Sequence, residues 1–188
     1  MFNDRYGLTQ AVIEGRKTMT RRLADPKHKY QSFKWWQPCL ELDFGLYGIT
    51  EDDNWEIIEP KYNLGEVVAI AQSYNSFYDD TYNPVLFPAG AGWNNKMFVK
   101  PELMPHRIRI TGIKGERLQD ISDADCLKEG IRYFPEINKF YFEDIRREEG
   151  FYFDNPREAF AALINKVFGR GTWDGNPWVE AHEFDLLK

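Results

Sequence analysis

The sequence predicts an α+β fold: a small, mainly antiparallel β-barrel with flanking helices and long loop insertions. Its 188 residues, 43% of them hydrophobic, are enough to bury one core without disulfides or a metal. Residues 106–113 alternate isoleucine with arginine or threonine, which is typical of a strand with one buried face. The helical patterns between the expected strands are short and unevenly spaced, which argues against repeated βαβ units. We therefore expect residues 1–188 to form a single domain.

The N-terminal half contains one expected helix and one expected strand. The helix covers residues 9–14, with Thr9 placed to cap its first amides and Gly15 suited to the left-handed residue that ends it. The strand covers residues 66–71. Its continuous run Val67-Val68-Ala69-Ile70 predicts burial on both faces.

Aromatic side chains are concentrated between residues 73 and 105, where Asn, Asp, Gly and Pro separate them. This composition predicts a long structured loop. The rings are those of Tyr74, Phe77, Tyr78, Tyr82, Phe87, Trp93 and Phe98. They can stack nucleic acid bases, but a small satellite core that holds down the loop is the more ordinary interpretation.

The C-terminal half contains two expected helices and a final strand. Ser122 begins a sequence similar to a capping box, and Gly130 closes the short helix that follows. The clearest helix spans residues 156–168, because Asn155 is placed as its cap and apolar residues recur at helical spacing. The last strand is expected over residues 178–186.

Charge and cysteine content exclude several classes of protein. The 30 acidic and 24 basic residues give a net charge of -6, which argues against a protein that coats duplex nucleic acid non-specifically. Cys39 and Cys126 form no C-x-x-C motif and the histidines have no metal-ligand spacing, so we expect no metal and no cofactor. We expect no signal peptide, because Asp4 and Arg5 stand where it would need an apolar stretch, and no membrane span, because no apolar run is long enough. We expect a reduced, cytoplasmic protein; the oligomeric state is not indicated.

Residues 15–22 read GRKTMTRR and concentrate positive charge and hydroxyl groups in an otherwise acidic chain. The side chains concerned are Arg16, Lys17, Thr18, Thr20, Arg21 and Arg22. Such a cluster can hold a phosphate or a polarised carbonyl, but it also fits a solvated basic edge strand. In a regular strand Lys17 and Thr20 face opposite sides, so they converge only across a turn or a bulge.

Glu129 falls in the last turn of the helix expected before Gly130. The helix dipole disfavours a carboxylate there by about 0.3–1 kcal/mol. On an exposed turn this placement is incidental. In a pocket, the same field raises the proton affinity of the carboxylate and prepares it for proton transfer.

Four blocks of the sequence together resemble the ASCH domain family. They are GRKTMTRR at 15–22, the strand at 66–71 after Gly65, ERLQDIS at 116–122 with the helix ending at Glu129-Gly130-Ile131, and Asn176-Pro-Trp178. The similarity is greatest to the phage and prophage-borne branch of this PUA-like family. Ala71 and Gln72 stand where that branch has an Arg-Glu pair. The chain also carries insertions near residues 23–60, 73–100 and 132–155.

The resemblance implies a PUA-like barrel and a protein that binds RNA or a nucleotide. In one bacterial branch of the family, the protein is an amidohydrolase that removes the acetyl group from N(4)-acetylcytidine. The Lys, Thr and Glu that act in that branch correspond here to Lys17, Thr20 and Glu129.

These residues support three functional hypotheses. The first is a cleft for RNA or a modified nucleoside or nucleotide, with ligand-binding residues Arg16, Thr18, Arg21, Arg22, Arg107 and Arg109 beside Lys17. The second is an amidohydrolase for acetylcytidine-type amides. In it, burial beside the arginines lowers the pKa of Lys17, which activates Thr20, while Glu129 protonates the leaving amine. The third is a phage structural or interaction protein.

Overall fold

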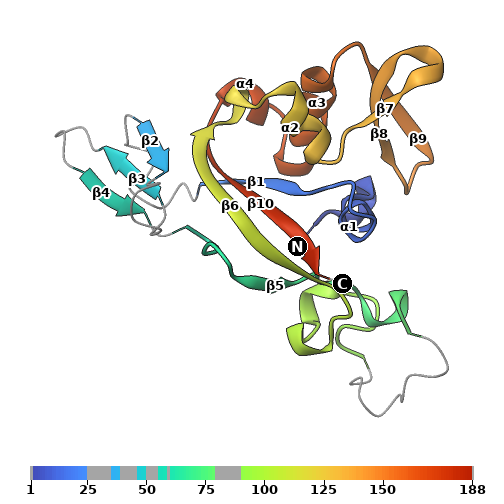
Figure 1. The fold of residues 1–188 in the computed structure, drawn as a ribbon. Helices are drawn as coiled ribbons and strands as arrows, with labels where there is room; N and C mark the ends of the chain where they lie inside the picture. Colours follow the sequence, from blue (N-terminus) through green and yellow to red (C-terminus); the bar gives the residue numbers. More distant parts are fainter. Residues whose placement is uncertain are drawn as a thin grey trace.

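A four-stranded antiparallel sheet forms the centre of the molecule (Figure 1). The fold is that of a computed structural model, which describes residues 2–24, 35–38, 46–49, 55–58, 60–78 and 90–187. In spatial order the strands of the sheet are β1 (Met19–Leu23), β10 (Trp178–Leu187), β6 (Arg107–Arg117) and β5 (Val67–Ala69). The sheet curls into a half-barrel. The predicted α+β class, with a small antiparallel barrel and flanking helices, is therefore confirmed.

The pairing of β1 with β10 joins the beginning and the end of the chain. Thr20 lies directly opposite His182 in this antiparallel ladder. On its other side β10 pairs with β6, and the register shifts between Glu183 and Phe184. As a result β10 separates β1 from β6 across the whole sheet.

The helices begin largely where local sequence signals place them. They are α1 (Leu8–Ile13), α2 (Asp123–Lys128), α3 (Pro156–Phe168) and α4 (Thr172–Gly175). Asn155 caps α3 by accepting a hydrogen bond from the Glu158 amide at 2.9 Å, and Ser122 caps α2, both as predicted. The expected Thr9 cap is wrong: Gly7 precedes α1, and the Thr9 hydroxyl donates instead to a carboxylate oxygen of Asp4. Within the described residues, none of the helices is long and apolar enough to cross a membrane.

The main core lies between the sheet and α3. The alternation in β6 buries Ile108 and Ile110 and leaves Arg107 and Arg109 exposed, as the pattern predicts. Buried apolar side chains in this core include Leu8, Val12, Phe142, Phe160, Leu163, Ile164, Val179 and Phe184. Because these residues come from both ends of the chain, the core fixes the N-terminal segment against the C-terminal half.

The prediction that the run from Val67 to Ile70 is buried on both faces is wrong. Val67 is 43% exposed, and only Ile70, at 1%, is fully buried. The physical reason is the position of β5 at the edge of the sheet, where, among the described strands, it pairs with β6 alone. An apolar run of this length reports hydrophobicity but not the number of neighbours that a strand will have.

Two of the insertions form small sheets that the sequence pattern did not indicate. One contains β2 (Trp35–Pro38), β3 (Leu46–Ile49) and β4 (Trp55–Ile58). The other contains β7 (Arg132–Phe134), β8 (Lys139–Asp144) and β9 (Glu149–Phe153). In the second sheet Phe142 stacks on Phe151, with ring centroids 5.1 Å apart, and this aromatic side packs against the main core.

The aromatic-rich loop contains short 3-10 turns and a small core of its own. The turns cover Tyr74–Ser76, Lys96–Phe98 and Pro101–Leu103. Tyr74 and Met104 are buried at the centre of this core, with Phe77, Tyr78 and Trp93 packed around them. The satellite-core interpretation is confirmed for these rings. Tyr82 and Phe87 lie outside the described residues, and Phe98 is exposed.

Candidate functional site

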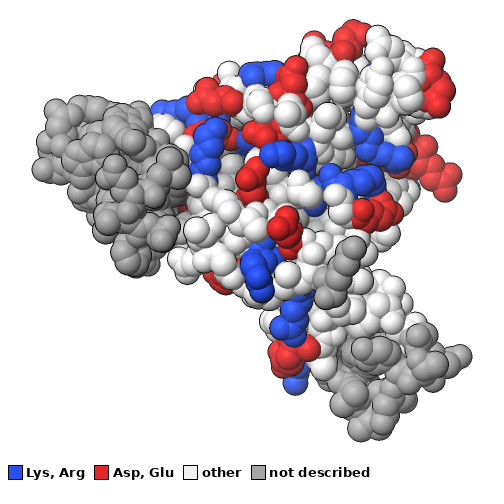
Figure 2. Space-filling view, in the orientation of Figure 1, with Lys and Arg blue, Asp and Glu red and all other residues white. Residues whose placement is uncertain are grey.

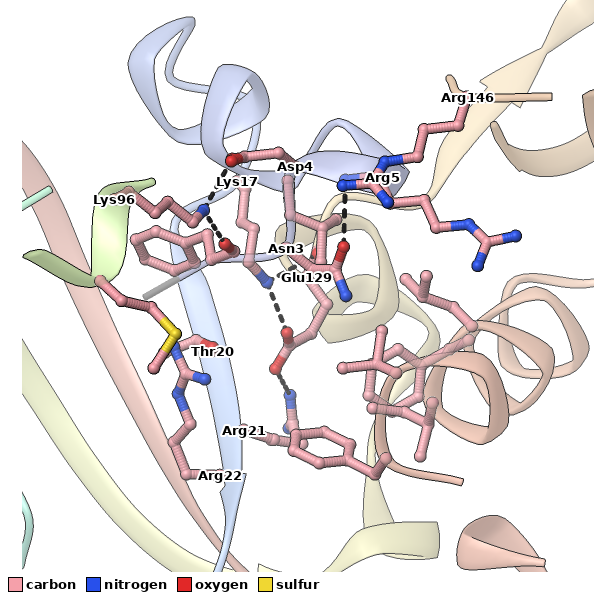
Figure 3. A pocket seen from close by; sticks show the side chains of 18 of the residues that line it. Asn3, Asp4, Arg5, Lys17, Thr20, Arg21, Arg22, Lys96, Glu129 and Arg146 are labelled. Carbon is pink, nitrogen blue, oxygen red and sulfur yellow. Dashed lines mark hydrogen bonds and ion pairs between the residues drawn. The ribbon is translucent and has the colours of Figure 1, made fainter. Parts of the chain in front are cut away.

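A cavity of about 560 Å³ lies between the N-terminal segment, β1, α3 and the Lys96–Phe98 turn (Figure 3). Lys17, Thr20 and Glu129 all line it. Glu129 is 112 positions from Lys17, so only the tertiary fold brings them together. The three residues that the sequence analysis expected to act together therefore line the same cavity.

Lys17 and Glu129 form a buried ion pair in the wall of this cavity. The Lys17 Nζ lies 2.6 Å from Glu129 Oε2 and 2.7 Å from the Glu129 carbonyl oxygen. Their side chains are only 2% and 5% exposed. The pairing is fixed by the backbone, because the Thr18 amide donates to the carbonyl of Lys128 at 2.9 Å and so holds the start of β1 against the end of α2.

Gly130 allows Lys17 to approach the end of α2 this closely. Its φ of +105° lies in a region that L residues rarely adopt. A Cβ at this position would lie 3.3 Å from Leu8 Cδ2 and 3.6 Å from Lys17 Cδ. The glycine expected to close the helix thus also leaves space for the lysine side chain.

Arg21 holds the other oxygen of the Glu129 carboxylate. Its Nη1 lies 3.1 Å from Glu129 Oε1, and Figure 3 shows the carboxylate between this guanidinium and the Lys17 amine. Arg21 also donates through Nε to Glu116 at 2.7 Å and through Nη2 to Asp125 at 3.2 Å. Buried and engaged by three carboxylates, Arg21 fixes the orientation of Glu129.

Burial lowers the pKa of Lys17, because the charged ammonium loses its hydration. The carboxylate of Glu129 opposes this effect, while the positive charges of Arg22 and Arg21 add to it. The pKa of the amine remains below its ordinary value of 10.5. Lys17 therefore releases a proton more readily than an exposed lysine does.

Thr20 contributes a hydroxyl group to the same cavity. The sequence raised the difficulty that Lys17 and Thr20 would face opposite sides of a regular strand. Since β1 begins only at Met19, Lys17 precedes the strand and is free of its alternation. Within the described part of the chain no protein group forms a hydrogen bond with the Thr20 hydroxyl, which leaves it available to a ligand.

Of the other expected ligand-binding residues, Arg21 and Arg22 line the cavity. Arg16 does not: it is exposed and pairs with Glu14 at 2.5 Å. Thr18 acts through its backbone and is likewise absent from the lining. For these two, the motif indicated the right segment but not which side chains face inward.

Arg107 and Arg109 also lie away from the cavity, so the expectation that they join Lys17 is not met. Two features of the fold explain this. Their side chains occupy the exposed positions of β6, opposite the buried isoleucines. In addition, β10 lies between β6 and β1.

Several lining residues carry no motif and were not found by sequence reasoning. The cations among them are Arg5, Lys96 and Arg146, and the apolar wall consists of Phe160, Leu163, Ile164, Val167 and Phe168. Lys96 is anchored to the N-terminal segment, with its Nζ 2.7 Å from an Asp4 carboxylate oxygen. Arg5 donates to Asp144 through Nε at 2.8 Å and Nη2 at 2.5 Å. The sequence indicates these apolar residues through their recurrence at helical spacing in α3. That spacing predicts a buried helix face but not a cavity.

Neither cysteine chemistry nor a metal site is evident in the described residues. Burial raises the pKa of the Cys126 thiol to about 12, so it remains protonated and unreactive. Cys39 lies outside the described residues. No group of three or more His, Cys, Asp or Glu side chains in the described part of the chain is arranged to hold a metal ion.

The fold and the site together define an α+β protein with a cation-lined cavity around a buried lysine–glutamate pair. Comparison of the chain with protein-family models, with curated proteins and with solved structures finds no match in any of the three. The resemblance to the ASCH family stays a prediction.

Proposed function

We propose that this protein binds a nucleoside or nucleotide, free or as part of RNA, in the cavity around Lys17 and Glu129. One observation carries the proposal: Lys17, Thr20 and Glu129, the three residues selected by the resemblance, line a single cavity although the fold is needed to unite them.

The size and surface of the cavity support this class of ligand. Its volume of about 560 Å³ falls within the range of about 300–1,000 Å³ typical of small-molecule sites. The half-buried side chains of Val167 and Phe168 offer an apolar wall to the flat faces of a base. The Thr20 hydroxyl can bond a polar edge, and the surrounding cations attract a sugar-phosphate.

The Thr20 hydroxyl gives a direct test of binding. Thr20→Val is expected to weaken the binding of a nucleoside 5′-monophosphate by about 2- to 10-fold, the value of one hydrogen bond of about 0.5–1.5 kcal/mol. Titration calorimetry with the four common nucleosides, N(4)-acetylcytidine and the four 5′-monophosphates measures the effect. Thr111→Val is the matched control, because Thr111 is exposed on β6 and does not line the cavity. If no compound binds, or if both variants behave like the unsubstituted protein, the proposal fails.

A second candidate function, hydrolysis of an acylated base amine, is favoured by the lowered pKa of Lys17 and the unbonded Thr20 hydroxyl. In this reaction the Thr20 oxygen attacks the acetyl carbonyl while a neutral Lys17 accepts the hydroxyl proton. When the carbon–nitrogen bond breaks, Lys17 returns that proton to the leaving amine, which departs as the free base. Lys17 then accepts a proton from water as the water oxygen attacks the acetyl carbon, and it returns this proton to the Thr20 oxygen as the ester bond breaks; the acetic acid released ionises to acetate in solution. Because Lys17 and Arg21 each donate a hydrogen bond to one Glu129 oxygen, we assign Glu129 to positioning Lys17 instead of protonating the amine.

Incubation with N(4)-acetylcytidine tests this second candidate. Acetate and cytidine are expected to form in equal amounts, and Thr20→Val is expected to reduce the rate by at least about 100-fold because the nucleophile is lost. Thr111→Val should keep the full rate. Absence of turnover leaves ligand binding as the function. Turnover that survives Thr20→Val overturns the assignment of Thr20 as the nucleophile.

A further inference from the structure

The Lys17 amine belongs to the wall of the cavity but is almost closed off from solvent. Lys17 and Glu129 both line the cavity, yet their side chains are only 2% and 5% exposed. A ligand can therefore make little contact with this amine unless a covering group moves.

The N-terminal segment supplies such a cover. Residues 2–5 all line the cavity. The ring of Phe2 has its centroid 5.9 Å from Lys17 Nζ and 5.8 Å from Arg22 Cζ, close enough for a cation–π interaction with each. The same ring packs on Phe184, with centroids 5.7 Å apart, and is only 9% exposed. Phe2 thus shields the Lys17 amine from one side.

The segment is anchored firmly at Arg5. The Arg5 carbonyl accepts a hydrogen bond from the Ile145 amide at 2.8 Å, and the Arg5 guanidinium pairs with Asp144 at 2.5 Å. These contacts fix residue 5 to the end of β8. Residues 2–4 lie beyond this anchor, and we call them the strap.

Lys96 fastens the strap to the rest of the molecule. Its Nζ donates hydrogen bonds to the Phe2 carbonyl, to an Asp4 carboxylate oxygen at 2.7 Å and to the Thr9 hydroxyl at 3.3 Å. Figure 3 shows the Lys96 amine directed at Asp4, beside Lys17. In the part of the chain that the structure describes, the other hydrogen bonds of the strap are local and join it to residues 5–9.

The turn that carries Lys96 belongs to a loop with its own core. Tyr74 and Met104 form the centre of that core, which is a separate cluster from the main core. Figure 2 shows the described part of the loop projecting from the body of the molecule as a lobe. Met97 and Phe98, next to Lys96 in the turn, are 68% and 62% exposed. Because the turn packs little against the body, Lys96 can withdraw while the core of the loop stays intact.

We infer that the strap is a gate, closed in this structure, which opens when Lys96 releases it and so admits a ligand to Lys17. Opening uncovers the Lys17–Glu129 pair without dispersing it, because Arg21 and the backbone contact between β1 and α2 hold the pair in place. The inference goes beyond the proposed function. It concerns access to the Lys17 amine and applies to any ligand that enters the cavity.

Acetylation of lysine amines by sulfo-N-hydroxysuccinimidyl acetate, followed by peptide mass spectrometry, tests the gate without a ligand. Lys96→Met should raise the acetylation rate of Lys17 by about 10-fold, the effect on a local opening equilibrium of losing a hydrogen bond to a charged group. Phe2→Ala should also raise this rate, because the cover is removed. Lys100→Met is the matched control, since Lys100 lies in the same loop, is exposed and does not line the cavity.

Two other side chains show whether the change is local. Lys128 is 44% exposed and reports the activity of the reagent, while the fully buried Cys126 thiol, measured by alkylation, reports opening of the main core. Neither rate should change in Lys96→Met. If Lys17 is acetylated at the same rate in Lys96→Met, or if Cys126 alkylation rises in step with it, the gate is overturned. The proposed function is judged separately, by the nucleoside titrations.

Discussion

Replacing Glu129 with alanine is expected to lower the free energy of unfolding by about 3–5 kcal/mol, the usual cost of removing one partner from a buried ion pair. The reason is the environment of the carboxylate. Lys17 Nζ lies 2.6 Å from one oxygen and Arg21 Nη1 lies 3.1 Å from the other. Without Glu129, the Lys17 amine remains in a site only 2% exposed with no carboxylate to balance it.

The double variant Lys17→Met with Glu129→Leu separates this charge effect from simple loss of packing. It is expected to recover most of the lost stability, because it removes both buried charges and fills their space with apolar groups. Arg21 keeps Glu116 and Asp125 as partners. The same double variant should bind no ligand. Relative to Glu129→Ala, it therefore regains stability without regaining ligand binding.

Urea unfolding of the two variants measures both effects, and an exposed ion pair supplies the control. Lys128 and Glu183 lie 2.7 Å apart with side chains 44% and 45% exposed. Glu183→Ala should cost no more than about 1 kcal/mol. A double variant as unstable as Glu129→Ala would show that packing, not unbalanced charge, causes the loss.

Local signals made several elements predictable from the sequence. The cap at Asn155 and the period of the following residues define α3, and the Ser122 cap defines the start of α2. These features depend on residues within one or two turns of each other. The edge position of β5 depends on its pairing with β6, a distant segment, which no local pattern encodes. The two insertion sheets pair neighbouring strands of three to six residues, which are too short for a periodic pattern to identify.

The sequence predicted some residues of the candidate cavity but not its geometry. Residue chemistry and the family resemblance selected Lys17, Thr20 and Glu129, and the fold brings them to one cavity. Arg107 and Arg109 were expected to join them because their charge suited a phosphate. Charge carries no information on strand order, and the placement of β10 between β6 and β1 removes both arginines from the site. Arg146 was missed for the converse reason, since it comes from an insertion without a motif.

Lowering the pH from 7 to 5 is expected to destabilise the protein by about 2 kcal/mol through His182 alone, rising to about 3 kcal/mol below pH 4. His182 is fully buried in β10, and its ring packs edge-on against Tyr62 with centroids 5.5 Å apart. Burial lowers the pKa of His182 to about 4, and the positive charges of Arg22 and Lys61 add to the effect against an opposing contribution from Glu180.

The sign follows from the two states. In the unfolded chain His182 has its ordinary pKa of 6.5, so between pH 6.5 and 4 the unfolded chain binds a proton that the folded protein does not. Stability is therefore complete above pH 6.5 and falls as the pH drops toward 4. Denaturant unfolding at pH 7, 6 and 5 should show this loss, and His182→Leu should abolish it because no group remains to be protonated. His106→Gln alters a partly buried histidine outside the core, and this control variant should lose as much stability at low pH as the unsubstituted protein. If His182→Leu still loses stability between pH 7 and 5, groups other than His182 cause the loss.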